Sequence, residues 1–130
     1  MSYTQIDLML AKPRIVHKGW GKEIIFTASD RKYTGKLLEF KKDSKISLHY
    51  HIEKDETWYI YKGTGIFRTI DKNTTVQIVQ PYKPGMIFEI KPGYIHQLIA
   101  EEETLVFEVS TPDNPKDSYR VEPGDSQKEK

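Results

Sequence analysis

The feature that most constrains this fold is a succession of short apolar segments separated by turn residues, which runs from Tyr33 to Val109. The segments are rich in Ile, Val, Tyr and Phe and recur at roughly 8–12-residue spacing, as the strands of sandwiches and barrels do. Glycine and proline mark turns between them, at Lys62–Gly65, Pro84–Gly85 and Pro92–Gly93. After Trp20, no segment keeps the 3.6-residue apolar period of a helix. The pattern predicts an all-β sandwich or closed barrel.

A chain of 130 residues is long enough for one domain with a substantial core and too short for two. We expect a single domain over residues 1–122, with its core at about 20–112, and a disordered polar tail at 123–130. At the other end, Tyr3–Leu10 is expected to form a short helix or an arm that pairs with a partner subunit.

The formal net charge of +1, with basic and acidic residues interspersed, argues against a general nucleic-acid or membrane-surface binder. The chain contains no cysteine, which excludes disulfides, a thiolate metal site and a cysteine nucleophile. No apolar run approaches the length of a membrane span, and the N-terminus lacks the basic start and long apolar core of a signal peptide. We therefore expect a cytoplasmic protein without nucleic-acid or membrane partners.

Three of the four histidines fall into two spaced patterns that predict a metal site. His49 and His51 point to the same face of a strand, because side chains at i and i+2 do so. Glu56 can reach the same point from the next strand, and His96 follows a Pro–Gly turn. Three imidazoles and one carboxylate suit one divalent transition metal, Zn, Mn, Fe, Ni or Co. The alternative is that His49 and His51 are ordinary polar residues on a solvent-facing strand.

These two blocks resemble the two motifs of the cupin superfamily, G-x5-H-x-H-x3–4-E-x6-G and G-x5-P-x-G-x2-H-x3-N. The matching residues are His49, His51, Glu56, Gly63, Gly85, Gly93 and His96. Asp43, Lys91 and Ala100 depart from the motifs, at positions that are not ligands. The resemblance covers about residues 35–109. It implies a double-stranded β-helix, the cupin jelly-roll barrel, with the metal inside one mouth, and often a homodimer.

A narrower resemblance connects ISLHYHIEKDETWYIYKGTG with the cupin portion of type II mannose-6-phosphate isomerases. The residues that match its pattern are Ser47, Leu48, His51, Glu56, Trp58 and Gly63, whereas His49 stands where that group often has glutamine. This resemblance implies metal-dependent aldose–ketose isomerisation of a sugar phosphate. In such a reaction the metal polarises the substrate oxygens and a base moves a proton between neighbouring carbons.

For that reaction the candidate catalytic residues are Glu56, Tyr94 and Tyr119, the tyrosines because they lie near the predicted mouth. The candidate substrate-binding residues are Trp58 and three cations for a phosphate, Lys36, Arg68 and Arg120. For each cation the alternative is a solvated surface position, and for Trp58 it is a plain core position. Lys36 shares parity with Leu38 and Phe40, so we expect it to project into the barrel. By the same alternation, Tyr50, Tyr59 and Tyr61 belong to the outer face and can form a sheet-to-sheet or dimer contact.

Two other functions fit the same residues. One is an Fe(II)-dependent dioxygenase or a lyase of the cupin type that uses the same four ligands. The other is a non-catalytic module that binds a sugar or another metabolite. For all of these functions the expected ligand is a small polar molecule, and for the isomerase it is a phosphorylated sugar.

Overall fold

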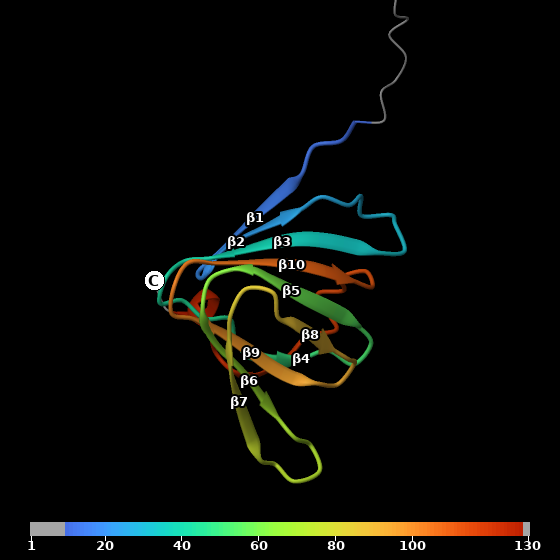
Figure 1. Ribbon diagram of the computed structural model, residues 1–130. Helices are drawn as coiled ribbons and strands as arrows, with labels where there is room; N and C mark the ends of the chain where they lie inside the picture. The colour runs from blue at the N-terminus through green and yellow to red at the C-terminus, as the bar shows by residue number, and fades with distance from the viewer. Residues whose placement is uncertain (1–9, 129–130) are drawn as a thin grey trace, which may run out of the picture.

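The computed structural model describes residues 10–128 and contains two antiparallel sheets that face each other (Figure 1). The strands are β1 (Arg14–Lys18), β2 (Gly21–Ile25), β3 (Thr34–Phe40), β4 (Leu48–Tyr50), β5 (Glu56–Lys62), β6 (Gly65–Ile70), β7 (Gln77–Tyr82), β8 (Ile87–Ile90), β9 (Ile95–Ala100), β10 (Thr104–Ser110) and β11 (Tyr119–Glu122). A short 3-10 helix, η1 (Asp125–Gln127), follows them. No helix in the described residues is long and apolar enough to cross a membrane. The all-β prediction is confirmed.

The two sheets interleave strands that are distant in sequence. The six-stranded sheet has the order β1-β2-β3-β10-β5-β8, and the five-stranded sheet has the order β11-β4-β9-β6-β7. Consecutive strands therefore cross repeatedly from one sheet to the other, which is the jelly-roll topology. Figure 1 shows the β6–β7 hairpin extending beyond the rest of the barrel.

The core lies between the sheets and is built by the strand alternation on which the sequence analysis relied. Its buried side chains are Trp20, Leu38, Phe40, Ile46, Trp58, Ile60, Phe67, Tyr82, Ile90, Leu98, Ala100 and Val106. Trp20 is buried in this core and stacks on Phe40 with ring centroids 4.4 Å apart. Tyr59 and Tyr61 are exposed on the outer face of β5, as their parity predicts. Burying one face of each strand in this way supplies most of the driving force for the fold.

The C-terminal segment differs from the expectation of disorder after Glu122. Up to Lys128 it is placed against the barrel, because η1 supplies partners to the loop before β4. The Asp125 amide donates to the Lys45 carbonyl (3.0 Å), and the Lys45 amide donates to Asp125 Oδ2 (2.8 Å). Gly124 is buried directly on the backbone of Ile46 and Ser47. The polar composition of this segment led to the prediction of disorder, because composition carries no information about backbone contacts of this kind. The predicted helix or arm at Tyr3–Leu10 lies, except for Leu10, outside the described residues.

This placement makes Gly124 a structural residue. Gly124→Val puts a side chain into the backbone of Ile46 and Ser47 and should lower the free energy of unfolding by about 1–3 kcal/mol, measured by urea denaturation. Lys128→Ala removes only an exposed ion pair to Asp125 and should change stability by less than about 0.5 kcal/mol. Equal, small effects for both variants would contradict the docking of this segment.

Candidate metal centre

Three strands bring the four predicted ligands to one point between the sheets. His49 lies in β4 directly opposite His96 of β9, and the β4–β9 pairing therefore holds two of the histidines side by side. His51 follows β4, and Glu56 is the first residue of β5 in the facing sheet. One nitrogen from each of His49, His51 and His96 lies within 4.8 Å of the others. The predicted convergence of the three histidines is confirmed.

The Nδ1 atom of each imidazole is hydrogen-bonded to a backbone carbonyl. The acceptors are the carbonyls of Ser47 for His49 (2.8 Å), Asp117 for His51 (2.6 Å) and Tyr94 for His96 (2.9 Å). A carbonyl oxygen can only accept, so each Nδ1 carries the proton and each Nε2 presents a lone pair. This is the tautomer that a metal-binding histidine needs, fixed by the outer hydrogen bond that usually accompanies it.

Glu56 lies beside the three imidazoles, and only one of its two carboxylate oxygens accepts a hydrogen bond from a described residue. Its Oε1 accepts a hydrogen bond from Trp58 Nε1 (2.7 Å). Its Oε2 lies 3.5 Å from His51 Nε2 and 3.8 Å from His96 Nε2. Both Glu56 Oε2 and His96 Nε2 are buried without a hydrogen-bond partner among the described residues. Because such orphaned polar atoms are costly, their convergence fits a divalent cation bound between them.

The protonation states agree with this assignment. Burial lowers the pKa of His49 to about 4, and it also lowers the pKa of His51 and, strongly, that of His96. All three are therefore neutral at pH 7 and able to donate a lone pair. Burial, together with the negative charge of Glu108, raises the pKa of Glu56. A bound cation would offset this penalty and favour the ionised carboxylate that a metal requires.

A cavity of about 310 Å³ borders the ligands and carries a buried network of opposite charges. Lys54 Nζ lies 3.0 Å from Glu108 and 2.8 Å from Asp113, and 3.9 Å from Glu56 Oε1. Burial alone would lower the pKa of Lys54, but the carboxylates outweigh it and raise that pKa well above the usual value. Lys54 is thus a permanently charged group beside the metal position.

Lys36 belongs to the same network and lies on β3, directly opposite Glu108 of β10. Its Nζ pairs with Asp113 (2.6 Å) and Glu23 (3.2 Å), and the side chain is buried in the barrel as its parity predicts. Sequence reasoning missed Lys54, Glu108 and Asp113. Glu108 had a detectable signal, since it shares the inward parity of Val106 in an apolar strand. Asp113 had none, because it comes from a loop after β10.

The remaining substrate and catalytic candidates divide between the cavity and other surfaces. Trp58 and Arg120 line the cavity with Lys36. Arg68 does not: it points to the other side of β6 and binds Glu122 (2.9 Å) and Gln97 (3.0 Å). Its parity is opposite to that of the inward Phe67, which the sequence analysis did not take into account.

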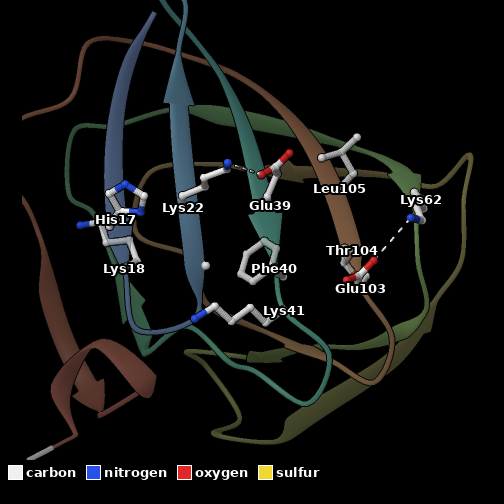
Figure 2. A pocket seen from close by; sticks show the side chains of 11 residues that line it. His17, Lys18, Lys22, Glu39, Phe40, Lys41, Lys62, Glu103, Thr104 and Leu105 are labelled. Carbon is white, nitrogen blue, oxygen red and sulfur yellow. Dashed lines mark ion pairs between the residues drawn. The ribbon is translucent and has the colours of Figure 1, made fainter. Parts of the chain in front are cut away.

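Neither tyrosine proposed as an acid or base lines this cavity. Tyr119 lies opposite Tyr50 in the β11–β4 pairing and stacks on its ring (5.2 Å between centroids), on the outer face. The Tyr94 side chain lines a separate cavity of about 520 Å³ beside the β6–β7 hairpin. His96 also lines that cavity, and the Tyr94 carbonyl orients the His96 ring. A third cavity, of about 560 Å³, lies over one end of the six-stranded sheet and is lined by none of the four ligands (Figure 2).

A family model described as Cupin matches residues 19–123. The chain belongs to the cupin family. The match spans most of the sequence and includes all four candidate ligands, so the cupin resemblance and the jelly-roll fold are confirmed together. No curated protein matches the chain.

Solved structures with the same fold include a capsular polysaccharide assembling protein, CapF from Staphylococcus aureus, with 18% identity and a TM-score of 0.73 over 88% of this cupin. Oxalate decarboxylase from Bacillus subtilis has 17% identity and a TM-score of 0.69 over 84%. Another structure of that decarboxylase, whose Mn(II) centres were studied, has 16% identity, a TM-score of 0.70 and the same coverage. This cupin spans 34% of the CapF chain and 30% of the decarboxylase chains, so the likeness concerns the fold alone.

Asp117 organises the centre without being a ligand. Its carboxylate accepts hydrogen bonds from three successive amides, those of Ile52, Glu53 and Lys54, and its carbonyl holds His51. The turn that sets His51 relative to Glu56 is therefore built around this one side chain. It was not detectable from sequence, because residue 117 is 66 positions from His51.

We predict that Asp117→Ala weakens divalent-metal affinity by roughly 10–100-fold, because the turn between His51 and Glu56 loses its common acceptor. Isothermal titration of the metal-free protein measures this. Asp71→Ala is the matched control, since Asp71 also accepts two backbone amides, but in the β6–β7 hairpin. An equal loss of metal affinity in both variants would show that the effect of Asp117 is not local.

The depressed histidine pKa values predict acid sensitivity of the metal-free protein. As pH falls below 6.5, the unfolded chain takes up protons at His49 while the folded protein does not until about pH 4, so stability decreases through this window. The contribution of His49 alone approaches roughly 3 kcal/mol at the lower end. Urea denaturation from pH 7 to pH 4 should show this loss, and His49→Gln should reduce it. An unchanged pH dependence in His49→Gln would contradict the burial of a neutral imidazole.

Proposed function

We propose that this cupin binds one divalent transition metal through His49, His51, His96 and Glu56 and acts on a small polar metabolite in the adjoining cavity. The observation that carries the proposal is the convergence of three Nε2 lone pairs and one orphaned carboxylate oxygen. A volume of about 310 Å³ lies at the lower end of the range for small-molecule sites. The lining is rich in charged groups, which suits a polar ligand more than an apolar one.

Within this class, the reaction that we propose is aldose–ketose isomerisation of a sugar or sugar phosphate. The sequence resemblance to type II mannose-6-phosphate isomerases is one support. The second is the Lys54–Glu108 pair, which places a charged hydrogen-bond donor and a base side by side at the cavity wall. When bound, the metal would supply Lewis acidity toward the substrate oxygens.

The proton transfer is assigned to Glu108 in place of the two tyrosines, and Lys54 takes the part of a hydrogen-bond donor. Burial would raise the pKa of Glu108, but Lys54 and Lys36 outweigh it and lower that pKa, so the carboxylate is ionised and can accept a proton from carbon. Lys54 stays protonated and can donate a hydrogen bond to an oxygen of the substrate. Trp58 orients Glu56 and excludes water from the floor of the site.

The charges of the cavity restrict where a phosphate can bind. Lys36 and Lys54 are already paired with carboxylates, so neither offers a free positive charge. Arg120 and Lys18 also line the cavity, and no described carboxylate pairs with either. A phosphate would therefore bind at Arg120 and Lys18, while a neutral sugar would need neither.

The test combines metal analysis with an activity screen. Purified protein should contain close to one equivalent of metal, and His51→Ala should lose it; unchanged metal content in His51→Ala would refute the site. Isomerase activity on sugars and sugar phosphates should fall about 100-fold or more in Glu108→Gln, and Arg120→Ala should raise KM only for phosphorylated substrates. The control Glu103→Gln alters a carboxylate in the exposed Lys62 pair. Iron with O2-dependent turnover would favour the dioxygenase instead, and tight metabolite binding without turnover would favour the binding module.

A further inference from the structure

The cavity of about 520 Å³ beside the β6–β7 hairpin lies at an open side of the barrel. β7 is the outermost strand of the five-stranded sheet, β8 is the outermost strand of the six-stranded sheet, and both line this cavity. The β6–β7 hairpin, which extends beyond the rest of the barrel in Figure 1, forms one of its walls. The volume falls within the range of about 300–1,000 Å³ that is usual for small-molecule sites.

The inner surface of this cavity is apolar and partly aromatic. Phe67 stacks on Phe88 with ring centroids 4.1 Å apart and 12° between the ring planes. Three branched aliphatic side chains extend the apolar surface around this pair, namely Ile70, Ile78 and Ile90. Water in contact with such walls gains few hydrogen bonds, so its replacement by an apolar molecule is favourable.

The His96 ring separates this cavity from the metal position. Its Nε2 lies 3.8 Å from Glu56 Oε2, whereas the ring is roughly parallel to that of Phe67, with 13° between the planes and 6.3 Å between the centroids. Of the four candidate ligands, only His96 lines this cavity. Because His96 Nε2 is buried, a molecule in the cavity does not reach the metal position. The cavity is therefore distinct from the substrate site proposed above.

Three charged residues line the rim of the cavity, and all three are exposed: Asp71, Lys72 and Glu89. Glu89 has the outward parity in β8 and so points away from the apolar floor. Asp71 Oδ1 accepts two backbone amides of the β6–β7 turn, and the Lys72 side chain packs against Gly93. The floor of the cavity therefore carries no charge, and its rim has one more carboxylate than ammonium group.

The other two cavities differ from this one in the charges that line them. The cavity beside the metal position is lined by four cationic and four acidic side chains, and the cavity in Figure 2 by four lysines and two glutamates. An anion is better accommodated in either of those cavities than beside the β6–β7 hairpin. The apolar floor and the slightly negative rim together favour an uncharged ligand here.

We propose that the cavity beside the β6–β7 hairpin is a second ligand site, which binds an uncharged and mainly apolar aromatic molecule. The ring system of the ligand contacts the Phe67–Phe88 pair, in the offset or edge-on arrangement that aromatic rings prefer. The open side between β7 and β8 gives access from solvent. Tyr94 is 48% exposed at this cavity, and its hydroxyl can bond a single polar group of the ligand.

The experiment is a fluorescence titration of the full-length protein with N-phenyl-1-naphthylamine, an uncharged aromatic probe that emits strongly only in apolar surroundings. One equivalent should bind with a micromolar dissociation constant, and Ile78→Glu should weaken binding by about 10-fold or more, because it places an ionised carboxylate in the apolar wall. Val79→Glu is the matched control and should leave the affinity unchanged. Val79 is as exposed as Ile78 (46% against 49%) but faces the other side of β7, with Arg68.

A second titration tests the charge preference. The sulfonated analogue of the probe, 8-anilino-1-naphthalenesulfonate, should bind this site about 5-fold more weakly or worse, because the rim is slightly negative and the floor cannot solvate an anion. Equal or tighter binding of the sulfonate would contradict an uncharged ligand.

Three further results would overturn the proposal. They are the absence of saturable binding at micromolar probe; an unchanged affinity in Ile78→Glu, which would place the probe in another cavity; and an equal loss in Ile78→Glu and Val79→Glu, which would place it on the exposed edge of β7. Circular dichroism checks that each variant is folded. If Ile78→Glu fails to fold, Tyr94→Glu carries the test, since the Tyr94 side chain is exposed at the same cavity. These readouts depend neither on catalytic activity nor on metal content.

Discussion

The strict alternation of side chains along β3, β5 and β10 is the constraint on which the rest of the structure depends. It directs Lys36, Glu56, Trp58 and Glu108 into the space between the sheets. The same strands direct large apolar side chains outward. A one-residue slip in register would exchange the two faces and destroy both surfaces, so the hydrophobic core and the metal centre specify one and the same register.

Buried charge is the second determinant of the site. Two lysines and several carboxylates are held in the cavity, which would be unfavourable for each group alone. The ion pairs of Lys54 and Lys36 offset that cost and leave the cavity close to electrical balance. Glu56 Oε2 and His96 Nε2 lack such compensation among the described residues, and this difference identifies the position where a cation fits. The distinction between compensated and uncompensated groups is the main physical argument for a metal site.

The parts of the site that could be predicted from sequence are those governed by local spacing. His49 and His51 converge because they are two residues apart on a strand, and Glu56 follows after one turn. His96 was added by its motif. Arg68 was misassigned because charge was considered without parity, and Tyr119 because its pairing with Tyr50 depends on a strand contact distant in sequence. Asp117 and Asp113 escaped notice, since a loop residue carries no periodic signal.

The sequence by itself was enough to predict an all-β chain and its cupin family, and to bring together the three histidines that converge in the structure. These properties follow from strand periodicity, turn residues and short motifs, all of which are local. Only the tertiary structure decided which lysines are neutralised, which carbonyl orients each imidazole, and that the segment after Glu122 docks on the barrel up to Lys128. Those outcomes depend on contacts between residues tens of positions apart, which the pairing of distant strands creates and no local pattern encodes.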